Sequence, residues 1–270
     1  MYHPMKKILF ILAVLLVSAP VAFAQTSAQP PETTAKQAII LDFETGEVLY
    51  DKNSDEQMPT SSMSKVLTTI VAYDAIREGK IKWDEELPVS ERAWKEGGSA
   101  SGGSTMFLNL NTTVKVSDLI KGIVIQSGND ACIVIAEGIA GTEENFAGLM
   151  NDKAAEIGMK NSHFMNSSGL PDPNHYSTAR DLATMALYLI HEYPEDYKFY
   201  SEKEFVYNNI KQGNRNPLLY KTIGADGIKT GHTDIGGYGM IGSAVANGRR
   251  VIMVINGTAS MQARADESEK

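Results

Sequence analysis

Three short motifs in this sequence carry the hydroxyl, amine and amide groups that acyl transfer through a serine requires. They are Ser62-Met63-Ser64-Lys65, Ser127-Gly128-Asn129 and Lys229-Thr230-Gly231. From average amino-acid usage, a chain of this length holds roughly one Ser-x-x-Lys pair by chance, but well under about 0.1 copies of each of the other two motifs. Because each motif occurs once, the set points to a nucleophilic serine enzyme.

The spacing of Ser62 and Lys65 suits a serine nucleophile with a lysine base. If a helix begins near Ser62, just after Pro59, three residues make almost one turn, and Lys65 lies beneath Ser62 on the same face. The helix N-terminus also favours a developing negative charge. A lysine with its ordinary pKa of about 10.4 is a poor base at neutral pH. Burial beside a second ammonium, for which Lys229 is the candidate, would lower that pKa.

Ser127 and Asn129 lie between two apolar helical segments, where Gly128 permits a tight backbone. Such a loop can present the Ser127 hydroxyl, which could pass a proton to a leaving amine. It can also present the Asn129 amide, which could hold both Lys65 and the substrate.

Lys229, Thr230 and Gly231 fall at the end of a strand-like run. On an edge strand we expect Lys229 and Thr230 to point into a cleft, where an ammonium and a hydroxyl suit a substrate carboxylate. We expect Gly231 to let the substrate backbone approach closely.

Each motif taken alone has an ordinary structural interpretation. The first fits a capping serine followed by a solvated lysine. The second fits a helix–helix turn with a polar cap, and the third fits a plain strand end. All three ordinary interpretations would have to hold together for the chain to lack a catalytic site.

The N-terminus predicts export. Residues 1–24 combine Lys6 and Lys7, an apolar run over residues 8–17 and the small-x-small cleavage site Ala22-Phe23-Ala24. The apolar run is shorter than the roughly 20 residues needed to span a bilayer, although an uncleaved anchor is the alternative. Cleavage would take the formal net charge from −8 to −10, which argues against nucleic acid or a polybasic membrane contact as partners.

Hydrophobic periodicity places strands at both ends of the chain and helices between them. The expected strands cover residues 38–43, 47–50, 205–207, 227–230, 239–246 and 249–255. The expected helices cover residues 63–76, 116–124, 130–139, 143–157 and 178–190. Asn247-Gly248 is a type I′ hairpin signal. We therefore predict a mixed α and β fold, in which an antiparallel sheet formed from both termini is flanked by helices and a helical subdomain is inserted.

Longer strings around the motifs resemble the serine penicillin-binding proteins, and more narrowly the low-molecular-weight D-alanyl-D-alanine carboxypeptidases. The resemblance covers nearly all of residues 36–266 and is carried by Pro59 to Lys65, Gln126 to Ala131, Tyr176 to Asp181 and Asp226 to Thr233. It implies the fold shared by serine β-lactamases and DD-peptidases.

The resemblance also implies a role for each site residue. Ser62 would be the acylated nucleophile and Lys65 its base, and Ser127 and Asn129 would relay protons and position the substrate. Lys229 and Thr230 would hold the terminal carboxylate. The backbone N–H groups of Ser62 and His232 would form the oxyanion hole. The Gly/Ser/Ala loop over residues 97–104 would lie over the cleft as a mobile segment.

Family members usually continue into a β-rich domain and an amphipathic anchor, which leads us to expect that both are absent from a chain that stops at Lys270. The expected organisation is a signal peptide (1–24), a linker (25–36) and a catalytic domain (37–270), divided into a sheet part (37–61 plus 204–270) and a helical part (62–203).

The function implied is that of a serine D-Ala-D-Ala carboxypeptidase on the periplasmic or cell-wall side of the inner membrane. Its substrate would be a peptidoglycan stem peptide ending in D-Ala-D-Ala, and β-lactams would be covalent inhibitors. The alternatives are a DD-endopeptidase, a class A β-lactamase and a non-catalytic muropeptide-binding protein. Against the β-lactamase, no Glu-x-x-Leu-Asn string follows Ser127.

No cofactor and no metal are expected. The five histidines show no zinc-peptidase spacing. Cys132 is the single cysteine, so no internal disulfide can form. Its apolar surroundings in the sequence favour a buried small side chain over a reactive thiol.

Overall fold

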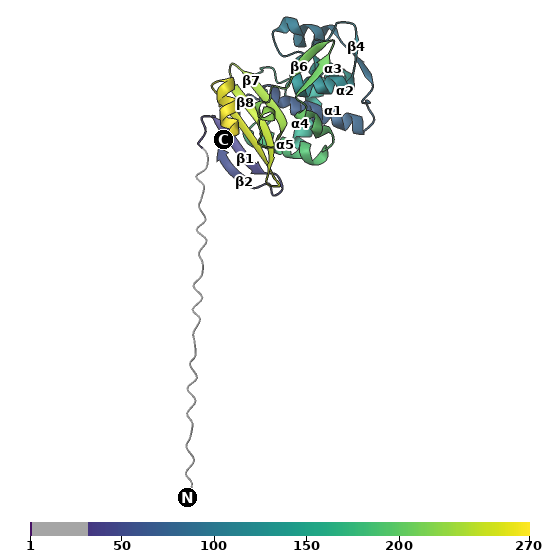
Figure 1. Ribbon diagram of the computed structural model, residues 1–270. Coiled ribbons are helices and arrows are strands. Elements are labelled where there is room, and N and C mark those ends of the chain that lie inside the picture. The colour runs from purple at the N-terminus through teal and green to yellow at the C-terminus, as the bar shows by residue number, and fades with distance from the viewer. Residues whose placement is uncertain (2–31) are drawn as a thin grey trace. The chain divides into compact units, whose positions relative to one another are not determined.

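A five-stranded antiparallel sheet joins the beginning and the end of the described chain (Figure 1). The computed structural model describes Met1 and residues 32–270, so the rest of the predicted signal peptide and the predicted linker up to residue 31 lie outside the described residues. The strand order is β2-β1-β9-β8-β7. The strands are β1 (Gln37–Asp42), β2 (Val48–Lys52), β7 (Ala225–Thr233), β8 (Gly237–Ala246) and β9 (Arg249–Thr258). Because β1 pairs along its length with β9, the predicted sheet from both termini is confirmed.

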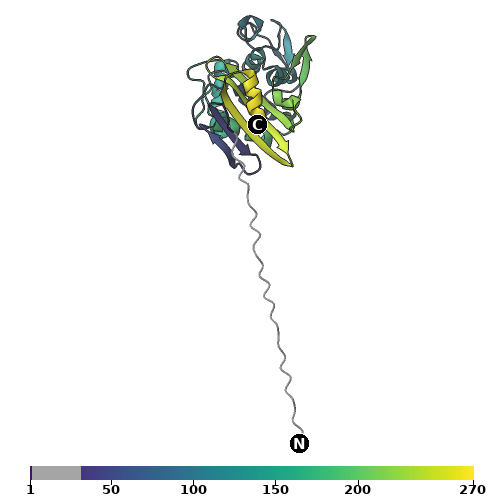
Figure 2. The same cartoon turned by 60° about the vertical axis from the view of Figure 1, so that its left-hand side comes forward.

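The alternation of side chains along the strands gives the sheet two buried faces. In β9, Ile252 and Val254 belong to the main core, whereas Ile255 belongs to a smaller core on the other face. Helix α5 (Ala179–Glu192) packs on β1 and β9, and α6 (Met261–Glu269) packs on β8 and β9. Figure 2 shows α6 in yellow across the sheet. This arrangement leaves β2 and β7 as the two edge strands.

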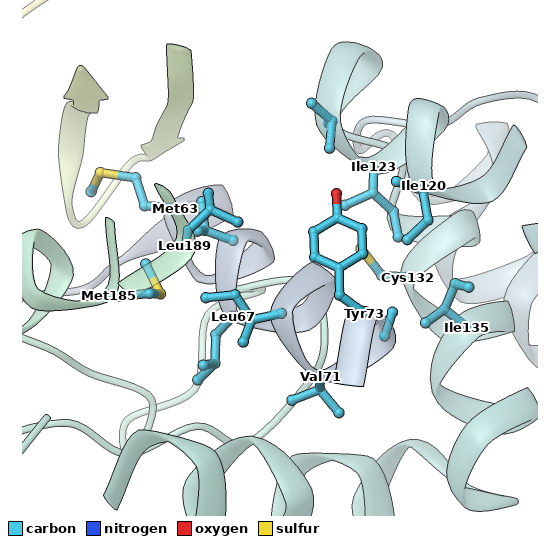
Figure 3. Close-up of a cluster of buried hydrophobic side chains, with 14 of the residues drawn as sticks. Met63, Leu67, Val71, Tyr73, Ile120, Ile123, Cys132, Ile135, Met185 and Leu189 are labelled. Atoms are coloured by element: carbon cyan, nitrogen blue, oxygen red, sulfur yellow. The ribbon is translucent and has the colours of Figure 1, made fainter. Parts of the chain in front are cut away.

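Helix α1 (Lys65–Arg77) passes through the main core, and ten of its 13 residues are buried. A helix that is apolar around its whole circumference is expected to be enclosed by other elements. Figure 3 shows Leu67 on the side of Leu189 from α5, and Tyr73 on the side of Ile120 and Cys132. The α1 helix therefore connects the sheet layer to the remaining helices, and Cys132 is buried as predicted.

The other elements surround α1 or extend from the helical region. The longer helices there are α3 (Asn129–Ala140) and α4 (Glu143–Glu156), which both pack on α1, and α2 (Val116–Lys121) precedes them. The short helical turns are η1 (Ser61–Ser64), η2 (Ala93–Gly97), η3 (Ser99–Ser101), η4 (Gly122–Gln126), η5 (Asp196–Ser201) and η6 (Pro217–Tyr220). Two small two-stranded sheets complete the set, one formed by β3 (Glu86–Pro88) with β4 (Thr113–Lys115) and the other by β5 (Glu204–Tyr207) with β6 (Ile210–Gly213).

Local turn chemistry explains two features of the strand pattern. Asn247 and Gly248 have φ angles of 53° and 76°, as the predicted type I′ turn between β8 and β9 requires. The predicted strand at 205–207 becomes β5, which pairs with β6 rather than with the five-stranded sheet. Across the part of the chain that the structure describes, we find no helix with the length and apolar character needed to cross a bilayer.

Candidate active site

The start of α1 presents Ser62 with Lys65 beneath it. Ser62 is the second residue of the 3₁₀ turn η1, and Lys65 begins α1 directly after that turn. The three-residue spacing brings Lys65 Nζ to 2.9 Å from Ser62 Oγ. The predicted pair is therefore formed, at the N-terminal end of a helical segment where backbone N–H groups lack helical partners.

The Lys65 amine has three oxygen neighbours, one from each of three segments. Besides Ser62 Oγ, Nζ donates to Asn129 Oδ1 at 2.8 Å and to the Ser168 carbonyl at 2.6 Å. A neutral amine has two N–H groups and one lone pair. With Asn129 and Ser168 accepting the two N–H groups, the lone pair of a deprotonated Lys65 points at the Ser62 hydroxyl.

Burial favours the neutral form of the Lys65 amine. Its side chain is 1% exposed, and this burial, with a contribution from the nearby Arg215 cation, lowers the pKa of Lys65 to about 8. Lys229 was the expected second cation, and its own pKa lies well below the ordinary value because of burial and the charges of Lys65 and Arg215. Burial also raises the pKa of the Cys132 thiol to about 12, which leaves it protonated and unreactive.

The loop between η4 and α3 brings Ser127 and Asn129 to the same site. Ser127 adopts a left-handed conformation with φ 68°, and Asn129 is the first residue of α3. The Asn129 N–H donates to the Ser104 carbonyl at 2.8 Å, which ties the predicted 97–104 loop to this position. Ser127 Oγ is buried without a hydrogen-bond partner among the described residues. An unpaired buried hydroxyl is costly, so a substrate group is its natural partner.

The edge strand β7 forms the opposite wall. It packs against η1, and Gly231 makes this contact possible, since a Cβ there would lie 3.0 Å from the Thr60 carbonyl oxygen and 3.1 Å from Ser61 Cβ. Ser61 Oγ also donates to Thr233 Oγ1 at 3.2 Å. The structure thus gives Gly231 a packing role against η1, in addition to the predicted access for substrate.

Lys229 and Thr230 lie differently with respect to the cleft. Thr230 lines it, whereas Lys229 is 3% exposed and its Nζ donates to the Thr230 carbonyl at 3.2 Å. Consecutive residues of a strand point to opposite sides, so Lys229 lies behind the wall that Thr230 forms. His232, the next predicted residue, is exposed on the cleft and stacks on Tyr238 with ring centroids 3.9 Å apart.

Between these walls lies a cleft of about 620 Å³. The predicted residues that line it are Ser62, Ser127, Asn129, Thr230, Gly231 and His232. Arg215 and Arg264 also line it, and sequence reasoning missed both. Arg215 Nη1 donates to Ser104 Oγ at 2.5 Å, and Arg264 Nη1 to the Gly231 carbonyl at 3.4 Å. Neither belongs to a short motif, so no spacing signal marked them.

A second missed element is the loop over residues 166–170, whose Ser168 carbonyl reaches Lys65. Gly169, with φ 78°, has no room for a side chain, since a Cβ would lie 1.8 Å from the Ser61 carbonyl oxygen. Glu143 anchors this loop, because its Oε1 accepts hydrogen bonds from the Ser167 N–H at 3.0 Å and from the Ser167 hydroxyl at 2.5 Å. Glu143 is buried and does not line the cleft.

His175 forms a hydrogen bond with Ser64 of η1. Its Nδ1 accepts the Met165 N–H at 3.2 Å, so Nε2 carries the proton and donates to Ser64 Oγ at 2.8 Å. Ser64 in turn lies 2.5 Å from Thr60 Oγ1. Burial lowers the pKa of His175 to about 4, because the charged form is removed from solvent.

Comparison with known proteins identifies the fold and the family. The model of the D-alanyl-D-alanine carboxypeptidase family, peptidase S11, matches residues 24–260. The chain is 42% identical over 261 residues to the D-alanyl-D-alanine carboxypeptidase DacC of Escherichia coli K12, an alignment that covers 96% of this chain and 65% of DacC.

Solved structures of similar proteins have the same fold. Penicillin-binding protein 5 of Haemophilus influenzae superposes with a TM-score of 0.86 at 41% identity, covering 90% of this chain and 70% of that one. Penicillin-binding protein D2 of Listeria monocytogenes, in its ampicillin-bound form, superposes with a TM-score of 0.77 at 29% identity, covering 90% and 97%.

The fold is therefore that of the serine DD-peptidases, as the sequence resemblance implied. The chain belongs to the peptidase S11 family of D-alanyl-D-alanine carboxypeptidases. It spans 60% to 65% of the length of the first curated relatives it matches.

The His175 environment predicts a pH dependence of folding stability. His175 is protonated near pH 6.5 in the unfolded chain and only near pH 4 in the folded chain. The unfolded chain therefore binds more protons between these pH values, and the free energy of unfolding decreases as the pH drops from 6.5 towards 4. A pKa difference of this size corresponds to about 3 kcal/mol. In urea unfolding at pH 7 and pH 4.5, His175→Gln should lose markedly less stability between the two pH values than the parent. The control His191→Gln should behave like the parent, and equal losses in all three proteins would contradict the assignment.

Proposed function

We propose that this chain is a serine-type D-Ala-D-Ala carboxypeptidase that removes the terminal D-Ala of peptidoglycan stem peptides through an acyl-enzyme on Ser62. The observation that supports this most directly is the buried Lys65 amine, 2.9 Å from Ser62 Oγ in a chain of the S11 family. Relatives at about 40% identity carry the carboxypeptidase name, which favours this activity over the endopeptidase alternative. The predicted signal peptide supports export to the periplasm, where the substrate lies.

Acylation follows from the contacts of Lys65. The lone pair of Lys65 takes the Ser62 proton while Ser62 Oγ bonds to the carbonyl carbon of the penultimate D-Ala. The carbonyl oxygen becomes an oxyanion, which the N–H groups of Ser62 and His232 stabilise. When the carbon–nitrogen bond breaks, the leaving D-Ala nitrogen receives a proton through the unpaired Ser127 hydroxyl. Water then attacks the ester, which releases the shortened peptide and restores Ser62.

Substrate recognition uses the cationic end of the cleft. Thr230, Arg215 and Arg264 line this end, and the Lys229 amine lies behind Thr230. A terminal carboxylate suits this group of donors. Burial lowers the pKa of Lys229 and of both arginines, and the charge of Arg215 lowers it further for Lys229 and Arg264. An arriving anion therefore relieves an existing electrostatic cost. Asn129 holds Lys65 through Oδ1 and leaves its amide N–H groups for the peptide backbone.

Removal of the nucleophile tests the activity. Ser62→Ala should lower kcat/KM for N-acetylated tripeptides ending in D-Ala-D-Ala by about 10³-fold or more, measured as D-Ala release, because no ester can form. Ser117→Ala removes a half-buried hydroxyl that does not line the cleft and should leave turnover unchanged, with thermal unfolding confirming that both variants fold. Substantial activity in Ser62→Ala would refute the proposal.

The pH profile tests Lys65 as the base. Since only the neutral amine can accept the Ser62 proton, kcat/KM should rise with pH around a midpoint near 8 and fall about tenfold per pH unit below it. Lys65→Arg should be inactive at every pH, because a guanidinium is not deprotonated in this range. The exposed Lys160→Arg change is the control. A profile that is flat between pH 6 and pH 9 would rule out this role.

The reaction with penicillin distinguishes a carboxypeptidase from a class A β-lactamase. Glu143 is committed to Ser167 and Arg92 and does not reach the cleft, so it is not placed to activate a deacylating water. We expect benzylpenicillin to leave an adduct on Ser62 that persists for minutes, seen as a mass increase in the intact protein and absent in Ser62→Ala. Rapid penicillin hydrolysis without an adduct would instead indicate a β-lactamase.

A further inference from the structure

Glu143 carries a buried carboxylate that does not line the cleft. It is the first residue of α4, where the helix N-terminus favours a negative charge. Removing a carboxylate from water nevertheless costs free energy unless it is paired and hydrogen-bonded. Both oxygens of this carboxylate have partners, and the partners come from two segments that each lead to a hydrogen-bond acceptor of Lys65.

The first oxygen of this carboxylate, Oε1, holds the 166–170 loop. It accepts hydrogen bonds from the N–H and from the hydroxyl of Ser167. Thr68 of α1 donates to the Ser167 carbonyl at 2.6 Å, so all three polar groups of this residue are fixed. The next carbonyl along the chain, that of Ser168, accepts Lys65 Nζ at 2.6 Å. A displacement of Ser167 would therefore move this acceptor away from the amine.

The second oxygen, Oε2, leads to the side-chain amide that also accepts from Lys65. It accepts a hydrogen bond from Arg92 Nη2 at 3.1 Å, and Arg92 directly precedes η2. The end of η2 packs on the start of α3, since a Cβ at Gly97 would lie 2.3 Å from the Asp130 nitrogen. The residue before Asp130 is Asn129, whose Oδ1 accepts Lys65 Nζ. The two oxygens of one carboxylate thus support both segments.

The carboxylate also acts on the Lys65 amine through its charge. The other titratable or charged side chains that act on this amine are Cys132 and Asp130 on α3, Arg215 after β6 and Lys229 on β7. Burial lowers the pKa of Lys65, and the charge of Arg215 lowers it further. The carboxylates of Asp130 and Glu143 act in the opposite direction, because a nearby negative charge favours the ammonium.

The charged groups around Glu143 itself are grouped on one guanidinium. Arg92 binds Glu143, Glu144 and Glu96. The side chains of Glu144 and Glu96 are 68% and 60% exposed, whereas that of Glu143 is 7% exposed. Because water and salt screen exposed charges, Glu143 is the member of this group whose charge reaches Lys65 with little screening.

We propose that Glu143 is a positioning residue for the base: it fixes the Ser168 carbonyl and the start of α3 around Lys65, and its negative charge stabilises the ammonium form of that amine. This inference rests on the proposed function, because it concerns the base of that reaction. Glu143 does not line the cleft, so it acts through Lys65 and not on the substrate.

The first test compares Glu143→Gln with Glu144→Gln in the pH profile of kcat/KM for an N-acetylated tripeptide ending in D-Ala-D-Ala. Glu143→Gln keeps an acceptor oxygen for Ser167 but removes the charge. The midpoint expected near pH 8 for the parent should therefore fall by about half a pH unit or more. Glu144→Gln makes the same change at an exposed carboxylate that also binds Arg92, and should keep the parent midpoint. Equal midpoints in all three proteins would overturn the proposal.

The contribution of the hydrogen bonds is measured on the plateau of the same profile, at high pH, where Lys65 is neutral. Glu143→Ala leaves Ser167 and Arg92 without this acceptor, so the Ser168 carbonyl is no longer held. We expect kcat to fall about tenfold while KM changes little, because the cleft keeps its lining. Thermal unfolding shows whether the variant folds, and an unchanged kcat in the folded variant would contradict the positioning role.

Arg92→Gln gives a second test that leaves Glu143 in place. The Arg92 side chain is 34% exposed, so the fold should tolerate its replacement. Loss of this cation leaves the charge of Glu143 less compensated, and the midpoint of the pH profile should move upwards, opposite to the shift in Glu143→Gln. A midpoint at or below that of the parent would overturn the proposal.

Penicillin acylation separates a failure of this inference from a failure of the proposed function. If the parent chain hydrolyses the tripeptide and benzylpenicillin acylates Ser62, but Glu143→Gln and Arg92→Gln keep the parent midpoint, the carboxypeptidase stands and the role of Glu143 fails. If the parent shows neither reaction, the proposed function fails and this inference fails with it.

Discussion

The burial of one amine organises this structure. Lys65 is 1% exposed, and removing an ammonium from water is costly unless its donors are satisfied. Its three oxygen neighbours come from η1, from the start of α3 and from the 166–170 loop. Each of these segments must therefore be held in place by others, such as Glu143 behind Ser167. The low pKa of Lys65, which its proposed role as a base requires, results from the same burial.

Close backbone approach at two glycines allows the sheet, η1 and the loop to meet around that amine. Gly231 lets β7 lie against Thr60 and Ser61, and Gly169 lets the loop lie against the Ser61 carbonyl. Any Cβ at Gly169 would overlap that carbonyl, so the loop could not bring the Ser168 oxygen to Lys65. The η1 turn is thus enclosed from two sides, while Ser62 still lines the cleft.

Local sequence signals identified most of the regular elements and less of the irregular ones. The helix expected over 178–190 is α5, with Thr178 capping it through the Asp181 N–H, because capping residues and apolar periodicity agree there. The helix expected over 116–124 instead ends at Lys121 and continues as the wider turn η4, after which Ser127 is left-handed. Apolar periodicity does not predict where an α-helix changes to a wider turn. That change depends on how Ser127 and Asn129 are held against their neighbours.

Residue type, spacing and alternation were enough to predict which residues supply the hydroxyl and amine groups, to which family the chain belongs, and that strands from both termini share one sheet. Only the folded chain shows that Lys229 lies behind Thr230, that Arg215 and Arg264 line the cleft, and that the Ser168 carbonyl accepts a hydrogen bond from Lys65. These features arise where segments distant in sequence meet, and no local pattern encodes which backbone groups and isolated side chains a fold will bring within hydrogen-bonding distance.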